Sequence, residues 1–195
     1  MRLKGSRRSA ETTAAVDLTT DSGEPKVTLS WDHHGGLEEP MDEGLATHLY
    51  VTLLRYARLG GTLEARGDLC HHVVEDVAIL LGDLLGREAQ GNVRRFADRT
   101  LPMDDALVHV ALDAGGRPYY VGQLEKVSPL WEHALRSLTM EAKFTLHVHV
   151  LAGTDPHHVL EAALKGVGLC LAEALAPSDR LESTKGRVRH EADAP

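Results

Sequence analysis

The sequence has few of the features that mark membrane, secreted or nucleic-acid-binding proteins. Its 195 residues contain no run of eighteen apolar residues, so we expect no membrane partner. The basic N-terminus, Met1 to Arg8, lacks the apolar stretch of a secretory signal. Only Cys70 and Cys170 are present, too few for a disulfide scaffold, which favours a reducing, cytoplasmic location. The formal net charge of -8 argues against a general binder of nucleic-acid phosphates.

Histidine, by contrast, is abundant and unevenly distributed. The chain has 12 histidines, and several form doublets. His71-His72 is followed by Glu75, and His157-His158 is followed by Glu161, each residue of the second set lying 86 positions after its counterpart. A shared offset of this kind indicates an internal duplication.

The expected secondary structure repeats as well. The first half should contain strands at 14–19 and 26–30, a helix at 43–59, a strand at 62–66 and a helix at 71–85. The second half should contain strands at 107–113 and 117–121, joined as a hairpin around Gly115-Gly116, then a helix at 129–142, a strand at 144–151 and a helix at 157–175. Both halves therefore have the order β-β-α-β-α.

This order predicts an α/β (α+β) protein in which the two duplicated halves pack through their helices, with the sheets outside and the helices between them. We expect residues 1–92 to form the first half, with an insertion near 31–43, and residues 93–186 to form the second. Residues 187–195 should be a flexible tail.

The two repeated motifs predict a paired metal site. Residues three or four positions apart share a helix face, whereas adjacent residues point about 100° apart. The two histidines of a doublet can therefore each align with the following glutamate but cannot easily bind one ion together. His48, in the helix before the first motif, and His147, on the strand before the second, would give three histidines and one glutamate per ion. That leaves open positions for substrate or water, and imidazole ligands suit zinc, iron or manganese better than magnesium or calcium.

One His-His pair at the start of a helix is more often a solvent-exposed cap than a metal ligand. The same pattern twice, at one offset, in a histidine-rich chain favours metal binding. The remaining histidines match no partner spacing and are interpreted as surface, strand or tail residues: His33, His34, His109, His133, His149 and His190.

Several blocks of sequence resemble the imidazoleglycerol-phosphate dehydratase family. His71-His72-Val-Val-Glu75-Asp76 resembles its first signature and His157-His158-Val-Leu-Glu161 its second. Further matches occur in the family's order: Arg95-Phe96, Pro102-Met103-Asp104-Asp105, Asp113-Ala-Gly-Gly116-Arg117-Pro118, Leu146-His147-Val148 and Ser183-Thr184-Lys185-Gly186. The resemblance covers nearly everything from residue 44 to residue 186, and Glu11-Thr12 adds a short match near the start.

The resemblance implies a hydro-lyase of histidine biosynthesis, which removes water from imidazole glycerol phosphate to give imidazole acetol phosphate with two manganese ions per chain. Ions at both ring nitrogens would hold the imidazolate form and let the ring expel hydroxide. The implied catalytic residues are Glu11, His48 and Glu161, with Glu11 shuttling the proton. The implied metal ligands are His48, His71, His72, Glu75, His147, His157, His158 and Glu161.

The resemblance also implies a small-molecule phosphate substrate held by cationic and hydroxyl groups, and a homo-oligomer of twenty-four chains with metals between subunits. Arginine guanidinium groups can donate two hydrogen bonds to a phosphate, and a lysine ammonium group adds a further positive charge. The residues at the matching positions are Arg95, Arg117, Lys165, Ser183 and Lys185.

The first helix departs from the family pattern. The family carries Asp-His-Met-Leu, then a Gln and later a His, whereas this chain has Thr47-His48-Leu49-Tyr50, then Thr52 and Tyr56. Such changes near a metal site can weaken metal affinity or activity without removing the site. Three interpretations stay open: an active dehydratase, a catalytically impaired metal-binding paralogue with a structural or interaction role, and a metalloenzyme acting on a related imidazole or phosphate substrate.

Overall fold

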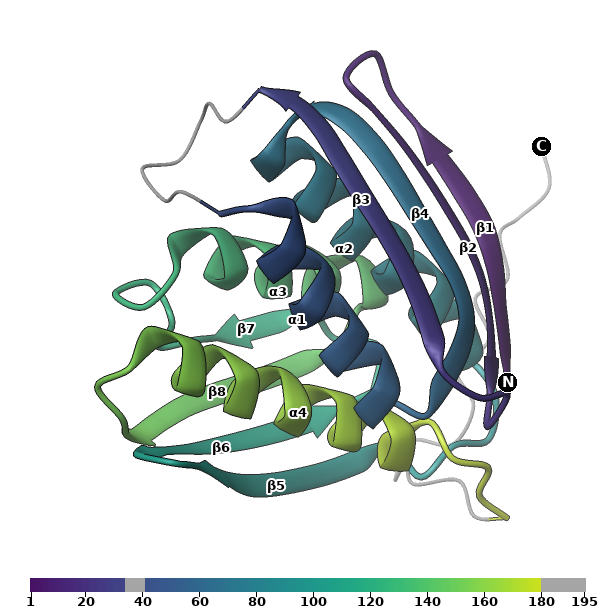
Figure 1. The fold of residues 1–195 in the computed structure, drawn as a ribbon. Coiled ribbons are helices and arrows are strands. Elements are labelled where there is room, and N and C mark those ends of the chain that lie inside the picture. Colours follow the sequence, from purple (N-terminus) through teal and green to yellow (C-terminus); the bar gives the residue numbers. More distant parts are fainter. Residues whose placement is uncertain (34–40, 180–195) are drawn as a thin grey trace, which may run out of the picture.

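A computed structural model describes residues 1–33 and 41–179 (Figure 1). The predicted tail at 187–195, most of the predicted insertion and the candidate phosphate-binding residues Ser183 and Lys185 lie outside these described residues.

The two halves consist of the same elements in the same order. The first half contains β1 (Arg2–Arg8), β2 (Thr12–Thr20), β3 (Pro25–His33), α1 (Glu43–Tyr56), β4 (Leu59–Leu69) and α2 (Cys70–Glu88). The second contains β5 (Phe96–Met103), β6 (Ala106–Asp113), β7 (Tyr119–Val121), α3 (Pro129–Ala142), β8 (Thr145–Ala152) and α4 (Pro156–Ala174). The predicted β-β-α-β-α series is present in each half and is preceded by one further strand, β1 or β5. The elements α1 and α3, β4 and β8, and α2 and α4 begin 86 residues apart, as the duplication predicts.

Each half forms one four-stranded sheet, in the order β1-β2-β4-β3 or β5-β6-β8-β7. The last strand of each order runs parallel to its neighbour, and the other pairs are antiparallel. The predicted hairpin between 107–113 and 117–121 is therefore wrong, because β8 lies between β6 and β7 and Tyr119 pairs with Thr145. A tight hairpin joins antiparallel neighbours only, and β7 pairs in parallel with β8.

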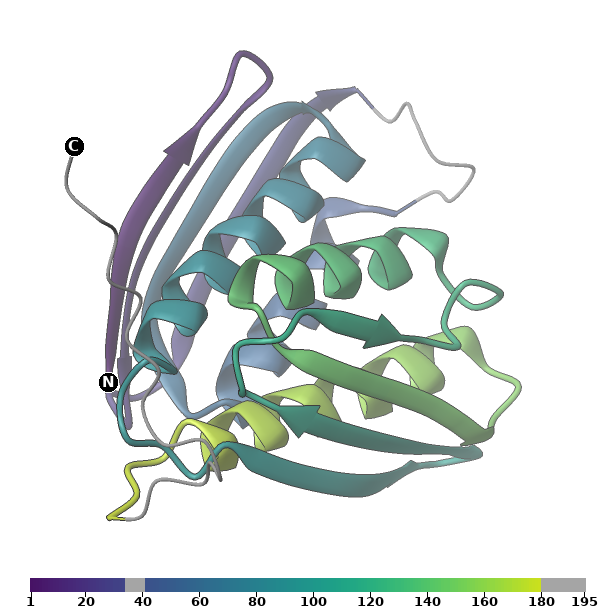
Figure 2. The same ribbon diagram turned by 180° about the vertical axis from the view of Figure 1, so that it is seen from behind.

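The helices lie between the two sheets, which confirms the predicted layering (Figures 1 and 2). They pack in pairs, α2 with α3 and α1 with α4, so each pair takes one helix from each half. Alternate strand residues such as Val108 and Val110 are buried beneath the helices. Trp131 and Tyr50 are the largest fully buried side chains, and their ring centroids lie 4.9 Å apart.

Two glycines set how closely the paired helices approach. A Cβ atom at Gly82 would lie 2.5 Å from the carbonyl oxygen of Leu138, and a Cβ atom at Gly168 would lie 2.6 Å from that of Leu53. Both distances are too short for any real side chain, so the backbones meet where only glycine fits. The two glycines are themselves 86 residues apart, and therefore the same close crossing occurs in both pairs.

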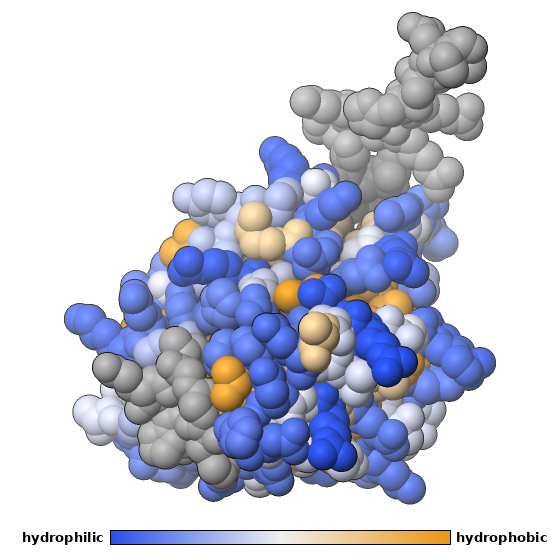
Figure 3. All heavy atoms as spheres, turned by 90° about the horizontal axis from the view of Figure 1, so that it is seen from above, coloured by the Kyte–Doolittle hydropathy of each residue, from blue (hydrophilic) through white to orange (hydrophobic). Residues whose placement is uncertain are grey.

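The surface seen from above the view of Figure 1 is largely hydrophilic, with only isolated hydrophobic residues (Figure 3). Within the described ranges, none of the helices combines the length and the apolar character needed to cross a membrane.

Candidate functional site

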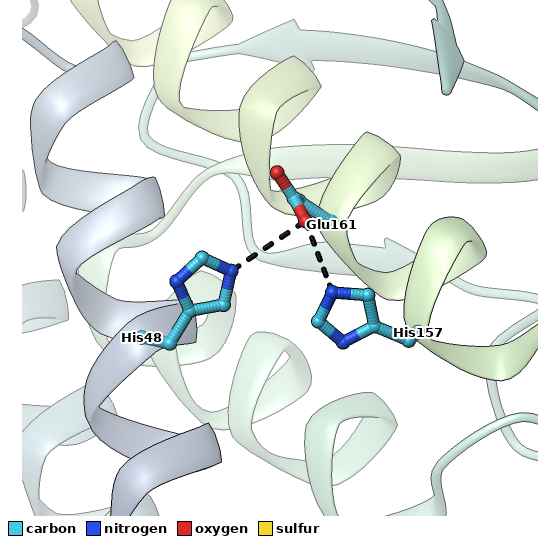
Figure 4. Close-up of side chains that lie close together, drawn as sticks. All are labelled: His48, His157 and Glu161. Carbon is cyan, nitrogen blue, oxygen red and sulfur yellow. Dashed lines mark hydrogen bonds and ion pairs between the residues drawn. The ribbon is translucent and has the colours of Figure 1, made fainter. Parts of the chain in front are cut away.

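The first group of candidate ligands lies between α1 and α4, and we call it the α1–α4 cluster: His48, His157 and Glu161 (Figure 4). Glu161 Oε2 lies 3.5 Å from His48 Nε2 and 3.2 Å from His157 Nε2. The Asp155 carboxylate caps α4 by accepting a hydrogen bond from the His157 backbone N–H at 2.8 Å, which fixes His157 in the first turn, one turn before Glu161. One ligand atom from each residue lies within 4.8 Å of the others, so the three side chains can meet on one ion.

Glu161 is kept ionised by its neighbours. Burial alone would raise its pKa, but the hydrogen bond and positive charge of Lys165, together with His48, outweigh burial and leave the pKa below its ordinary value. Lys165 Nζ donates to Glu161 Oε1 at 2.8 Å, and the same ammonium lies 5.7 Å from the ring centroid of Tyr56. Glu161 therefore presents a charged oxygen to the two histidines and its other oxygen to Lys165.

A second group lies between α2 and α3, and we call it the α2–α3 cluster: His71, Glu75 and His133. Glu75 Oε1 lies 2.9 Å from His133 Nε2 and accepts a hydrogen bond from Ser137 Oγ at 3.2 Å. His71 lies one helical turn before Glu75, and its Nδ1 atom is buried without a hydrogen-bond partner among the described residues. The residue types and the helices that carry them repeat those of the α1–α4 cluster, with a motif helix supplying His and Glu and the neighbouring helix one His. Among the described residues, however, only the α1–α4 cluster has all three ligand atoms within 4.8 Å of one another.

His133 is a site candidate that the spacing argument missed. The 86-residue offset itself carries the signal, because it places α3 at the position equivalent to α1. A histidine of α1 facing the second motif implies a histidine of α3 facing the first motif. His133 stands one residue before the position equivalent to His48.

The second histidine of each doublet points away from these clusters, as the angle between adjacent helical residues predicts. His72 Nδ1 lies 2.8 Å from Asp68 Oδ1 and 3.8 Å from Glu11 Oε2. His158 Nδ1 lies 2.7 Å from Asp105 Oδ1, and its Nε2 atom lies 3.4 Å from Asp104. The hydrogen bonds to Asp68 and Asp105 raise the pKa of His72 and His158, respectively. Both rings are thus oriented by an aspartate at Nδ1.

His147 is not brought to either cluster. It lies on β8 between Leu146 and Val148, which are buried against the helices, so its own side chain faces the opposite side of the sheet. Its ring neighbours are His149, at 5.9 Å between centroids, and Tyr119, at 6.3 Å. The strand alternation therefore separates His147 from the candidate ligands carried by the helices.

The candidate phosphate-binding cations form two separate groups. Arg95 donates two hydrogen bonds to Asp113, at 2.6 and 2.9 Å, and Arg117 lies 3.7 Å from the same carboxylate. The Arg95 backbone N–H donates to the carbonyl of Ala174, at the far end of α4 from His157. Within one chain, then, the two arginines meet at Asp113 near the C-terminal end of α4, whereas Lys165 lies beside Glu161 in the α1–α4 cluster.

Comparisons with known proteins agree on one family. The family model described as imidazoleglycerol-phosphate dehydratase matches residues 42–171. The enzyme of that name from Pyrobaculum arsenaticum is 42% identical over 178 residues, covering 84% of this chain and 95% of its own. The one from Kineococcus radiotolerans is 37% identical over 197 residues, covering 90% and 98%.

Solved structures give the same result. The crystal structure of IGPD from Pyrococcus furiosus superposes with a TM-score of 0.78 and 29% identity, covering 94% of this chain and 100% of that one. The crystal structure of the dehydratase from Staphylococcus aureus gives a TM-score of 0.72 and 25% identity, covering 91% and 100%.

Proposed function

The chain belongs to the imidazoleglycerol-phosphate dehydratase family, a family of hydro-lyases in histidine biosynthesis, and from this premise we propose how its own residues bind metal and substrate. The family's reaction converts imidazole glycerol phosphate into imidazole acetol phosphate by loss of water. Each helix-borne cluster has a histidine in contact with a glutamate, and the relatives compared above are all named as dehydratases.

We propose that each cluster holds one manganese ion, so that a chain carries two. The observation that supports this most strongly is the α1–α4 cluster, in which two imidazoles and a carboxylate lie within 4.8 Å of one another. At the equivalent helix crossing His133 contacts Glu75, and His71 lies one helical turn before Glu75. This donor chemistry suits a divalent transition metal. Among the described residues the buried Nδ1 atom of His71 has no hydrogen-bond partner, which fits the same proposal because a buried polar atom is costly unless a ligand satisfies it. In this assignment His133 replaces His147, which the position before the second motif had predicted as a ligand.

The fourth protein ligand of each ion is proposed to come from a neighbouring chain, as His72 or His158. A metal-binding histidine generally donates one ring N–H to a carboxylate and binds the ion through the other nitrogen. Asp68 and Asp105 hold the Nδ1 atoms of His72 and His158 in this way, and both side chains are partly exposed at helix starts. This supports metal-linked assembly into a symmetric shell. We propose that the shell contains twenty-four chains, as the family resemblance implies.

Glu11 is proposed to move the proton in the reaction. It lies beside His72, so a subunit that contributes His72 to its neighbour's ion would bring the Glu11 carboxylate to the same site. The ions would supply Lewis-acid stabilisation of the negative charge that the substrate ring gains. Arg95 and Arg117 are proposed to exchange their shared contact with Asp113 for the substrate phosphate, with Lys165, Ser183 and Lys185 completing the pocket.

We also propose a reducing cytoplasm as the working location, since the chain has only two cysteines, Cys70 and Cys170, which are too few for a disulfide scaffold.

The experiment that tests the metal assignment compares three variants for bound manganese, turnover of imidazole glycerol phosphate and particle mass. His133→Ala should lose about half of the bound manganese. The double variant His72→Ala, His158→Ala should lose most of it and dissociate into smaller particles. His147→Ala should keep the metal content and the particle mass of the parent. An unchanged manganese content in His133→Ala would remove this residue from the ligand set, and an intact particle in the double variant would refute the shared site.

A further inference from the structure

We propose that the contact between Asp76 and Thr12 positions the Glu11 carboxylate for proton transfer, a role that rests on the proposed function of Glu11 in the reaction. Glu11 lies in the turn between β1 and β2, and its side chain is 58% exposed. An exposed turn residue samples many positions unless its neighbours are tied to a rigid element. A group that transfers a proton must stay within hydrogen-bond reach of the reacting atom, so the turn needs an anchor.

The Asp76 carboxylate binds the chain on both sides of this turn. Thr12, the first residue of β2, donates a hydrogen bond from its hydroxyl group to Asp76 Oδ2. Arg7, near the end of β1, donates from Nε to Asp76 Oδ1 at 2.8 Å. Thr12 is 4% exposed and the Asp76 side chain is 13% exposed, so water competes little for these bonds. Each carboxylate oxygen of Asp76 therefore anchors one strand of the turn.

The anchor belongs to the helix that carries His72. Asp76 lies four residues after His72 on α2, and residues at this spacing share one face of a helix. Glu11 Oε2 lies 3.8 Å from His72 Nδ1. Because α2 holds both His72 and the turn, the distance between Glu11 and His72 is set by one rigid element.

Two backbone hydrogen bonds complete the placement of Glu11. Its N–H donates to the Ser9 hydroxyl oxygen at 3.2 Å, and its carbonyl accepts from the Asp68 N–H at 3.1 Å. The Thr12 N–H donates to the same Ser9 oxygen at 3.0 Å. The backbone of Glu11 is therefore held on both sides, and its side chain starts from a fixed point.

The duplication separates the Asp76 contact from metal binding. The residue 86 positions after Asp76 is Ala162, which is fully buried. The α1–α4 cluster brings three ligand atoms within 4.8 Å of one another without a carboxylate at that position. Asp76 thus occurs in the half that also carries Glu11, which favours a role in placing Glu11 over a role in holding an ion.

The test measures kcat, KM and bound manganese in full-length variants, with imidazole glycerol phosphate as the substrate. Thr12→Val removes the hydroxyl group and nearly keeps the shape of the side chain. It should lower kcat by about tenfold to a hundredfold, as expected for a reacting group misplaced by up to about 1 Å, with KM and manganese content unchanged. Thr12→Ser keeps the hydroxyl group and should keep most of the parent's kcat. Asp83→Asn is the matched control and should have the parent's kcat, because Asp83 forms a similar pair with Arg87 on an exposed part of α2.

A Glu11→Gln background distinguishes positioning from a general effect on the fold. Glu11→Gln alone should lower kcat about a hundredfold or more. In that background Thr12→Val should cause no further fall in kcat, because the contact acts through Glu11. If Thr12→Val does not fold, Ser9→Ala takes its place, since Ser9 is exposed and its hydroxyl group holds the Glu11 N–H.

The outcomes separate this role from the proposed function of Glu11. Parental kcat in the folded turn variant, or a further fall in kcat in the Glu11→Gln background, would overturn the positioning role and leave Glu11 in the reaction. Parental kcat in Glu11→Gln would instead refute the proposed function of Glu11, and the positioning role with it.

Discussion

The close crossing of α1 and α4 at Gly168 gives a sharp test of how packing positions the metal ligands. In Gly168→Ala the new methyl carbon would lie 2.6 Å from the Leu53 carbonyl oxygen and 2.8 Å from Tyr56 Cβ. Ordinary van der Waals contact begins near 3.4 Å, so α1 must move away by several tenths of an ångström. Overpacking of this kind costs about 1–3 kcal/mol, and the helix propensity gained by alanine returns at most about 1 kcal/mol.

A net loss of about 1–2 kcal/mol in the free energy of unfolding should lower Tm by about 2–8 °C in a protein of this size. The same movement withdraws His48, which already lies 3.5 Å from Glu161. Manganese titration should therefore show weakened binding at the α1–α4 cluster and unchanged binding at the α2–α3 cluster. Calorimetric unfolding of the metal-free protein measures the first effect, and calorimetric titration measures the second.

Gly44→Ala is the matched control, because Gly44 lies on α1 as well but is exposed. Its new Cβ would meet only the carboxylate of Asp42, at 3.1 Å, which caps α1 by accepting a hydrogen bond from the Leu45 backbone N–H and needs to shift by only a few tenths of an ångström. This variant should have the same Tm as the parent and should bind manganese at both clusters with the affinity of the parent. If Gly168→Ala behaved in the same way, the glycine would not define the helix crossing, and the link between packing and the site would fail.

Three further predictions concern substrate, thiols and pH. Arg95→Ala and Arg117→Ala should each weaken substrate binding by about 1.5–3 kcal/mol without changing metal content; a KM equal to that of the parent would make them surface charges. Burial raises the pKa of Cys170 to about 12, so a thiol-specific chromogenic reagent should label the native protein only as fast as it unfolds. The hydrogen bond to Asp68 raises the pKa of His72 above its ordinary value of 6.5. The His72–Asp68 pair therefore stabilises the metal-free fold fully at pH values below 6.5, and this stabilisation is lost as the pH rises through the raised pKa. Asp68→Asn should consequently lower the urea midpoint near pH 5.5 and leave it nearly unchanged near pH 9; equal losses at both pH values would contradict this.

The repeated elements could be predicted from sequence because their apolar residues are strongly periodic, whereas β1 and β5 could not. Of the residues in β1, only Leu3 is buried, and the rest of the strand is largely polar. In β5 every residue keeps some exposure, and Pro102 is a poor strand residue. Both strands lie at a sheet edge, where one neighbour is sufficient and the sequence signal is weak.

The two His-His-x-x-Glu motifs could also be predicted from the sequence, because each lies within a single helix and the pattern occurs twice. His133, which contacts Glu75, stands one residue before the position equivalent to His48, so a match at the exact 86-residue offset does not find it. His147 precedes the second motif along the chain, which predicts a ligand, but one residue of strand alternation turns its side chain to the other side of the sheet. Proximity in sequence and proximity in space differ most where a strand meets a helix.

The pairing of helices from opposite halves has a consequence for the origin of the chain. Neither half contains both helices of a cluster, since α1 meets α4 and α2 meets α3. A half-length ancestor with one His-His-x-x-Glu motif could have assembled the same cluster only as a homodimer, in which each copy lent a histidine to the other. Gene fusion would convert that bimolecular encounter into an intramolecular one, at an effective concentration in the millimolar range set by the short connection between α2 and β5. On this view the 86-residue offset is the trace of a symmetric dimer, and under the proposed metal assignment each half would still need the other to bind its ion.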